Sequence, residues 1–330
     1  MKIFRLVASV VLVLIIFASV YFIYSRLTTL SSEFRLVEFL RVDPAKSFSV
    51  IVLPDTQFYS SHYPGIFCSQ TQWIVDYKDD LNIVFVSHMG DIVNDGAKEM
   101  KQWKNASKCL RKLDGIVPYS VIPGNHDTNI QSDKSSGLSM YDKFFPVLTS
   151  KRNGWYGGNF DGNRNNFEMI SSNGLKLLFI NLEIEPTDAV LNWANDIVRN
   201  NSTVYTIVTT HKYLDIDGKN PENKRAFSID GNTGEDIWNK LVFDNCSIAM
   251  VLSGHFHGEN KITKINSCGN DVSQIVQDYQ ARENGGNGWL RIYVFTPNDK
   301  KIDVYTYSPY LGKIEIDDNS SFSLGIPVDN

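Results

Sequence analysis

Short apolar runs that end in Asp, Asn or His recur along this chain and constrain its fold more than any other feature. Runs of this length, rich in β-branched and aromatic residues, predict buried β-strands. The five runs are Phe48–Leu53, Ile83–Ser87, Tyr119–Ile122, Val204–Thr210 and Ile248–Ser253. Open α/β sheets place their sites at the carboxyl ends of strands. We therefore expect the polar residues that follow these runs to meet at one edge of the fold.

Helix-like segments alternate with the apolar runs. Apolar residues recur every three to four positions in Gln70–Asp80, Glu99–Leu113 and Asp188–Arg199, as in helices that bury one face. A further strand is expected at Leu175–Asn181, and the segment from Leu290 onward reads as a hairpin that closes a second sheet. Strands that alternate with helices in this way predict an α/β fold.

One segment, Asn129–Phe167, interrupts the alternation. It is rich in Gly, Asn and Ser, and it predicts a loop-rich insertion too long for a plain connection. Within it, Trp155 and Tyr156 would either shape a substrate groove or pack the insertion against the body. The sequence leaves both interpretations open.

The residues at the five strand ends form a set of oxygen and nitrogen donors. Asp, Asn and His together suit Mn, Fe or Zn better than calcium. Seven donors exceed the ligands of one four-coordinate ion, so we expect two metal ions that share a carboxylate. Two ions ~3.5–4 Å apart can hold the attacking and leaving oxygens of a phosphoryl displacement and acidify a water between them. The donors are Asp55, Asp91, Asn125, His126, His211, His255 and His257.

Taken in order, the polar blocks resemble the calcineurin-like metallophosphoesterase superfamily. They read Asp55-Thr56-Gln57, Gly90-Asp91, Gly124-Asn125-His126-Asp127, His211 and Gly254-His255-Phe256-His257. The resemblance implies a four-layer α/β/β/α sandwich with a dinuclear metal site at the carboxyl ends of its strands. The first block, together with Asp278-Tyr279-Gln280 and Gly285–Trp289, is similar to an exported branch of that superfamily.

Residue roles follow from the resemblance. It implies that Asp55, Gln57 and His257 hold the first metal, that Asp91 bridges both ions, and that the second is held by Asn125, His211 and His255. A hydroxide bridging the ions would attack phosphorus in line, and His126 would act as the general acid that protonates the leaving oxygen. The expected activity is hydrolysis of a phosphomonoester or phosphodiester.

Two positions depart from the pattern of the superfamily. Gln57 stands where many members have His, and an amide oxygen is a weaker donor than imidazole, so the first metal would bind less tightly or be a harder ion. An acid three residues after the bridging Asp usually assists the general acid, but Asn94 stands there. We therefore assign that orienting role to Asp95. Both departures favour the alternative hypothesis, an exported binding or receptor-like protein that keeps the scaffold without catalysis.

The N-terminus carries an apolar stretch long enough to cross a membrane. Leu6–Tyr24 is 19 residues without a charge, preceded by Lys2 and Arg5. About 20 apolar residues span a bilayer, and the basic flank predicts a cytoplasmic N-terminus with the body exported. The alternative is a cleaved signal peptide, although no good small-x-small cleavage site follows. We expect the body outside the cytoplasm (extracellular, periplasmic or lumenal), or secreted after cleavage.

The four cysteines fit an exported protein. Cys68, Cys109, Cys246 and Cys268 show no Cys-x-x-Cys spacing, so a structural zinc site is not expected. Disulfides between sequence neighbours, Cys68–Cys109 and Cys246–Cys268, would suit an oxidising compartment. Three connectivities are possible, and buried free thiols are the alternative.

These observations predict the organisation and partners of the chain. We expect an anchor or signal peptide at residues 1–30, a linker at 31–46, the phosphoesterase domain at 47–310 and a tail at 311–330. The net charge is −5, and the only charges in residues 1–30 are three basic ones, so the body is more acidic still. An acidic body argues against nucleic acid as a partner. The expected partners are a phosphoester substrate and, through the N-terminal helix, a membrane.

Overall fold

The structure, a computed structural model, describes residues 19, 36–147, 154–220, 227 and 230–326. The chain divides into one unit that ends at Val42 and a second, Asp43–Asn330. In the first unit, residues 36–40 are helical. The expected anchor at residues 1–30 lies outside the described residues except for residue 19. Within the described part of the chain, no helix is long and apolar enough to cross a bilayer.

The second unit is built on two mixed sheets, each with seven strands among the described residues. In the first sheet, β1 lies between a parallel neighbour, β2, and an antiparallel one, β11, and β3 continues the parallel half. The order is β13-β12-β11-β1-β2-β3, with β14 also paired to β12. Its strands are β1 (Phe48–Leu53), β2 (Ile83–His88), β3 (Tyr119–Val121), β11 (Leu290–Thr296), β12 (Lys301–Ser308), β13 (Lys313–Glu315) and β14 (Ser321–Gly325).

The second sheet has the order β4-β5-β6-β7-β8-β10-β9. Its centre, β6-β7-β8-β10, is parallel, and antiparallel strands pair at both edges. The strands are β4 (Tyr156–Phe160), β5 (Asn165–Ser172), β6 (Leu175–Leu182), β7 (Tyr205–Thr210), β8 (Ile248–Ser253), β9 (Gly258–Ile265) and β10 (Asp271–Asp278).

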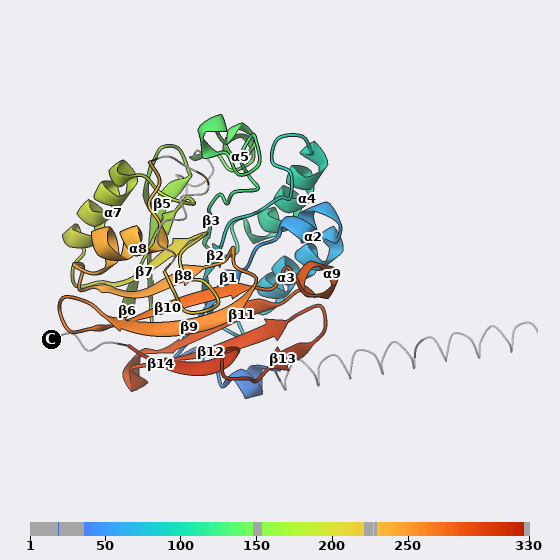
Figure 1. Cartoon of the computed structure of the whole chain (residues 1–330). Helices are drawn as coiled ribbons and strands as arrows, with labels where there is room; N and C mark the ends of the chain where they lie inside the picture. Colours follow the sequence, from blue (N-terminus) through green and yellow to red (C-terminus); the bar gives the residue numbers. More distant parts are fainter. Residues whose placement is uncertain (1–18, 20–35, 148–153, 221–226, 228–229, 327–330) are drawn as a thin grey trace, which may run out of the picture. The chain divides into compact units, whose positions relative to one another are not determined.

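Helices cover the outer faces of the two sheets, with α2, α3 and α4 on one side and α7 and α8 on the other (Figure 1). The α-helices are α2 (Gln57–Ser61), α3 (Pro64–Asp76), α4 (Met100–Leu110), α5 (Ser139–Phe144), α7 (Asp188–Asn200), α8 (Gly234–Ile237) and α9 (Glu283–Gly286). Short single turns are η1 (Arg111–Leu113), η2 (Lys134–Ser136), η3 (Trp238–Val242) and η4 (Pro297–Asp299). This is the α/β/β/α sandwich expected from the sequence.

The inner faces of the two sheets share one hydrophobic core. Phe85 of β2 stacks on Phe179 of β6 with ring centroids 4.1 Å apart. Every residue of β1 is buried, because one face meets the second sheet and the other meets helices. That two-sided burial is why the run Phe48–Leu53 contains no alternating polar position.

The outer helical layers pack through their apolar stripes. On the first sheet, Trp73 of α3 lies against Tyr307 of β12, with ring centroids 5.2 Å apart. On the second sheet, α7 buries Val190, Leu191 and Val198 in a separate core cluster. Thr187 caps the start of α7 by accepting a hydrogen bond from the Val190 backbone N–H.

The structure contains two disulfides, and each joins cysteines that are neighbours in the sequence. Cys68–Cys109 ties α3 to α4, and Cys246–Cys268 ties the segment after η3 to the turn before β10. The described residues contain no free cysteine. The alternative of buried free thiols is therefore wrong for this structure.

Three expectations about the fold need correction. The C-terminal hairpin exists as β11 and β12, but it joins β1 in the first sheet instead of closing a second one. The insertion contains α5, β4 and the first three residues of β5, because the polar strand β4 lies at the edge of the second sheet. The segment expected to be a tail from residue 311 supplies β13 and β14 to the first sheet.

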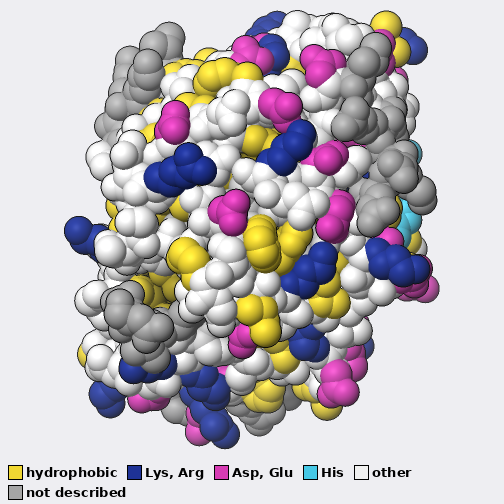
Figure 2. Space-filling view, turned by 60° about the vertical axis from the view of Figure 1, so that its left-hand side comes forward, with side chains coloured by type: hydrophobic (Ala, Val, Ile, Leu, Met, Phe, Trp, Pro, Cys, Tyr) yellow, Lys and Arg dark blue, Asp and Glu magenta, His cyan; other side chains and the backbone are white. Residues whose placement is uncertain are grey.

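The surface carries charges of both signs. On the face shown in Figure 2, acidic and basic side chains are interspersed among polar ones. The expectation that nucleic acid is not a partner stays a prediction.

Candidate metal centre

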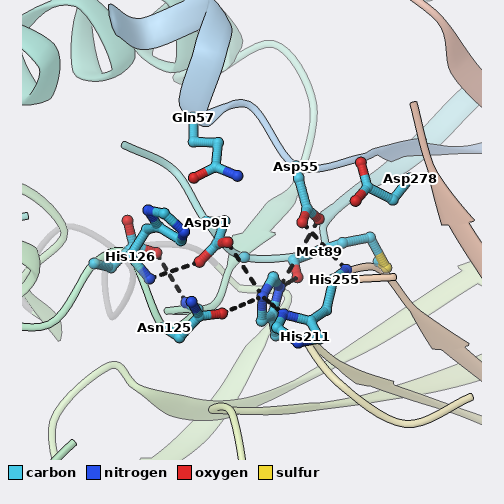
Figure 3. A network of polar contacts seen from close by, with 12 residues as sticks. Asp55, Gln57, Met89, Asp91, Asn125, His126, His211, His255 and Asp278 are labelled. Atoms are coloured by element: carbon cyan, nitrogen blue, oxygen red, sulfur yellow. Dashed lines mark hydrogen bonds and ion pairs between the residues drawn. The ribbon is translucent and has the colours of Figure 1, made fainter. Parts of the chain in front are cut away.

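Residues from the ends of strands in both sheets meet in one buried cluster (Figure 3). The first sheet supplies Asp55 after β1, Asp91 after β2 and Asn125 after β3, and the second supplies His211 after β7 and His255 after β8. Asp55, Asp91, Asn125 and His211 are all less than 5% exposed. These five residues lie together, as the carboxyl-end rule predicts.

The tightest part of the cluster surrounds one imidazole nitrogen. His211 Nε2 lies 3.4 Å from Asp91 Oδ2, 3.1 Å from Asn125 Oδ1 and 3.2 Å from His255 Nδ1. Among the described residues, Asp91, His211 and His255 form the one group of acidic or histidine side chains close enough together to hold an ion. These residues and Asn125 are the set expected to bind the second metal.

Hydrogen bonds to groups outside the cluster orient His211 and Asn125 so that their ligand atoms point into it. His211 Nδ1 lies 2.9 Å from the Met89 carbonyl and donates to it, which leaves Nε2 to face the cluster. Asn125 Nδ2 donates to Ser132 Oγ, 3.3 Å away, which turns Oδ1 inward. Burial, with the nearby His211, lowers the pKa of His255 to about 3, so that ring is neutral. Burial alone would lower the pKa of His211, but its contacts with Asp91 and the Met89 carbonyl raise it, so these converging atoms require a cation between them, either a proton on Nε2 or a metal ion.

The other half of the cluster surrounds Asp55. Its Oδ2 accepts hydrogen bonds from the His255 backbone N–H at 3.1 Å and from Gln280 Nε2 at 3.3 Å. Its Oδ1 and the Oε1 of Gln57 are buried and have no hydrogen-bond partner within the described residues. A buried polar atom without a hydrogen bond is costly, and a metal ion would satisfy both oxygens. Gln57 and Asp55 therefore fit the first metal.

Buried acidic groups give the site a strongly negative character. Burial, together with the charges of Asp278 and Asp91, raises the pKa of Asp55 well above its usual range. Burial alone would raise the pKa of Asp91 too, but its contacts with His211 and His126 lower that pKa to about 2. Such a concentration of carboxylates favours bound cations.

Two glycines let the backbone approach the carboxylates closely. A Cβ on Gly124 would lie 2.2 Å from Asp91 Oδ1, and a Cβ on Gly254 would lie 2.2 Å from Asp55 Oδ1. Any other residue at either position would displace a predicted ligand. These glycines explain why the blocks read Gly-Asn-His-Asp and Gly-His-x-His.

Asp127 holds together two loops of the site. Its Oδ2 accepts from the backbone N–H groups of Gly124 and Ile92, and its Oδ1 accepts from that of Val93. Burial and the nearby Asp91 nevertheless raise its pKa to about 7. The last residue of the third block therefore connects the loop after β2 to the loop after β3.

His126, the expected general acid, lies beside the cluster. Its backbone N–H donates to Asp91 Oδ1 at 2.9 Å, and its Nδ1 lies 2.9 Å from the Asn94 carbonyl. The Asp95 carboxylate instead accepts from the Lys98 backbone N–H. The expectation that Asp95 orients His126 is wrong here, because the carbonyl of Asn94 makes that contact.

The remaining histidines differ in burial. The side chain of His257 is 54% exposed, and its Nε2 lies 3.9 Å from Asp278 Oδ2, at the rim of the cluster. His88 is fully buried and its Nε2 lies 2.9 Å from Thr56 Oγ1, so it is structural. His62 contacts Ser61 beside it.

Sequence reasoning gave no role to Asp278 and Gln280, which the structure places against Asp55. Asp278 is the last residue of β10, and Gln280 follows it. The run Val272–Asp278 ends in an acid in the same way as the five strands that were recognised. The rule applied to those strands could have found Asp278.

A calcineurin-like phosphoesterase family model matches residues 48–259, the span that holds the five blocks. This chain belongs to the calcineurin-like phosphoesterase family. A curated relative from Bacillus subtilis (strain 168), the uncharacterized protein YvnB, is 34% identical over 278 residues, which is 82% of this chain. The chain spans 20% of the length of that relative.

Solved structures share the fold of this family member. A dimetal phosphatase from Danio rerio is 12% identical with a TM-score of 0.56, covering 86% of this chain and 100% of its own. GAP50, described as the anchor in the inner membrane complex of Plasmodium, is 12% identical with a TM-score of 0.50, covering 86% and 90%. At 12% identity, these similarities show a shared fold and nothing further.

Proposed function

We propose that this protein hydrolyses phosphoesters with two metal ions (Mn, Fe or Zn) held by the cluster. The observation that carries the proposal is the convergence of possible ligand atoms from Asp91, Asn125, His211 and His255, beside an Asp55 oxygen that has no hydrogen bond within the described residues. Two bound ions supply an activated water and neutralise charge on the phosphoryl group. The residues of the chain then hold the substrate in line and supply the proton for the leaving oxygen.

His126 is suited to donate that proton. With Nδ1 donating to the Asn94 carbonyl, Nε2 is the atom that can carry a proton toward a leaving group. Gln131 Nε2 lies 3.0 Å from His126 Nδ1 and 3.2 Å from His126 Nε2, and it can donate to Nε2 once the proton has left. The ring is partly exposed, so substrate can reach it.

Hydrolysis of a chromogenic phosphomonoester and a phosphodiester by the full chain, with Mn²⁺ added or chelated, tests this function. We expect chelator-sensitive turnover that Asp91→Asn abolishes and that His126→Gln lowers by about 100- to 10,000-fold. His62→Gln is the matched control, since His62 is an exposed histidine whose ring contacts Ser61 and Tyr63 instead of the cluster. Full turnover by Asp91→Asn would refute the proposal.

The second candidate is a binding or anchoring protein that keeps the fold without turnover. The observation that favours it is the absence of a carboxylate contact to His126 from Asp95. In addition, the Plasmodium protein of similar fold is described as an anchor. Full metal loading without hydrolysis of either ester would support this candidate.

We also propose that the body lies outside the cytoplasm, tethered by residues 1–30 or secreted after their cleavage. The two disulfides support the proposal, because such bonds persist in oxidising compartments. Protease treatment of intact cells that express the full chain tests it. Protection of the body from protease until the cells are lysed would contradict it.

A further inference from the structure

Gln280 links the predicted ligand Gln57 to two carboxylates. Its side chain is buried, and its Nε2 lies 2.9 Å from Asp278 Oδ2 and 3.3 Å from Asp55 Oδ2. Its Oε1 accepts a hydrogen bond from Gln57 Nε2. The two amides and two carboxylates thus form one continuous chain of hydrogen bonds.

The carboxylates set the direction of this chain. In the metal-loaded site these carboxylates are ionised and only accept hydrogen bonds, so the NH₂ group of Gln280 must face Asp278 and Asp55. The oxygen of Gln280 then faces Gln57, which must present its own NH₂ group in return. The remaining atom, Gln57 Oε1, is buried without a hydrogen-bond partner in the described structure, and the amide lies above Asp91 (Figure 3).

We propose that Gln280, held by Asp278, is a positioning residue that turns the amide oxygen of Gln57 toward the first metal. The inference rests on the metal centre of the proposed function and assigns two residues that the family blocks do not include. An oxygen ligand at this position favours a harder ion such as Mn²⁺ over Zn²⁺. In the reverse orientation, Gln57 would present an NH₂ group, which cannot bind a metal.

The segment that carries Gln280 is fixed from outside the site. Arg282 Nη2 donates to Glu259 Oε1 and its Nη1 donates to Glu315 Oε2, both at 2.7 Å. Tyr279, between the two positioning residues, lies under the Arg282 guanidinium and contacts Glu259 Oε2 at 3.3 Å. The backbone N–H of Gln280 also donates to Asp278 Oδ1 at 2.9 Å. These contacts fix the backbone that carries Gln280, and its hydrogen bonds to Asp278 and Asp55 orient the amide.

Manganese binding to the metal-free full chain tests the proposal without an activity assay. Calorimetric titration should show two Mn²⁺ sites in the wild type, and Gln280→Met should weaken one of them by about 10- to 100-fold. Gln277→Met is the matched control, because Gln277 is a buried glutamine of β10 that bonds Tyr293 instead of the site. Denaturant unfolding of each variant shows whether it folds. A folded Gln280→Met variant with two wild-type sites would overturn the proposal.

A second substitution separates orientation from simple packing. Gln57→Glu offers oxygen atoms in both orientations, so it should restore the lost site in the Gln280→Met background. With Gln280 present, the same change should weaken the site, because whichever way Gln280 turns, its oxygen then faces a carboxylate. Equal effects of Gln57→Glu in both backgrounds would overturn the orienting role. Two Mn²⁺ sites without phosphoester hydrolysis would refute the proposed function and leave this inference standing.

Discussion

Substitution of Gly254 by alanine tests how tightly the backbone after β8 packs against the predicted metal ligand Asp55. The new Cβ would lie 2.2 Å from Asp55 Oδ1, 3.2 Å from Asp55 Cγ and 3.4 Å from Met89 Cβ. Non-bonded carbon and oxygen atoms need more than 3 Å, so the carboxylate or the loop must move by about 1 Å. Because Asp55 and the backbone N–H of His255 are hydrogen-bonded, moving either one disturbs ligands of both expected ions.

The magnitude follows from this displacement. A misplacement of about 1 Å in a catalytic centre costs roughly 100-fold in rate, so we expect about that loss in kcat/KM for a chromogenic phosphoester. Overpacking of a well-packed site lowers the free energy of unfolding by about 1–3 kcal/mol. We expect Mn²⁺ affinity, measured by calorimetry on the metal-free chain, to fall with the rate.

Gly65→Ala is the matched control, because a Cβ on Gly65 in α3 meets nothing within 4 Å. Alanine in a helix is favoured over glycine by about 0.5–1 kcal/mol, so this variant should be slightly more stable and equally active. Wild-type Mn²⁺ affinity and turnover in Gly254→Ala would show that the site tolerates the shift, and the argument from close contact would be wrong.

Further predictions concern pH, disulfides and metal removal. Burial raises the pKa of Glu168 well above its usual range, so this residue favours the fold at low pH and opposes it increasingly as pH rises. Glu168→Gln should therefore gain stability over the wild type between pH 5 and pH 8, by at most about 1.4 kcal/mol per pH unit, in urea unfolding; an equal difference at both pH values would contradict this. Cys68→Ser with Cys109→Ser opens a loop with a sequence separation of 41 and should lower the unfolding free energy by about 2–4 kcal/mol; an unchanged melting temperature would contradict it. Saturating Mn²⁺ at about 100 times its Kd should stabilise the metal-free chain by roughly 2.7 kcal/mol per site; Asp91→Asn should abolish most of that gain, and an unchanged gain would exclude Asp91 as a ligand.

The parts of the fold that the sequence predicted well are those buried on two sides. Phe48–Leu53 and Ile248–Ser253 form strands with the predicted bounds, because the burial of every residue leaves an uninterrupted apolar run. Tyr156–Phe160 was missed, because this edge strand is only partly buried and keeps the Gly and Asn typical of a loop. The helix expected from Gln70 begins at Pro64, because Pro is favoured in the first turn of a helix. The apolar stripe used for the prediction did not reveal this earlier start.

The candidate site shows the same division. Residues next to obvious strands, such as Asp55 and His211, were found because position along the chain implies position in the sheet. The contact of His126 with the Asn94 carbonyl was not predictable, since every residue has a backbone carbonyl and the residue type does not show which one is used. Gln280 was missed as a contributor because its role depends on Gln57, a partner 223 positions away.

The pairing of β1 with β11 determines when this protein can complete its fold during synthesis. Phe48 lies opposite Phe295, so one edge of β1 has no partner until most of the chain has left the ribosome. Until then, β1 is an apolar edge strand, the kind of segment that pairs with other chains and aggregates. The contact between Asp55 and the backbone of His255 spans 200 residues as well, so metal cannot guide the early steps. We therefore expect β1 to be the segment most prone to aggregation until the last strands are made.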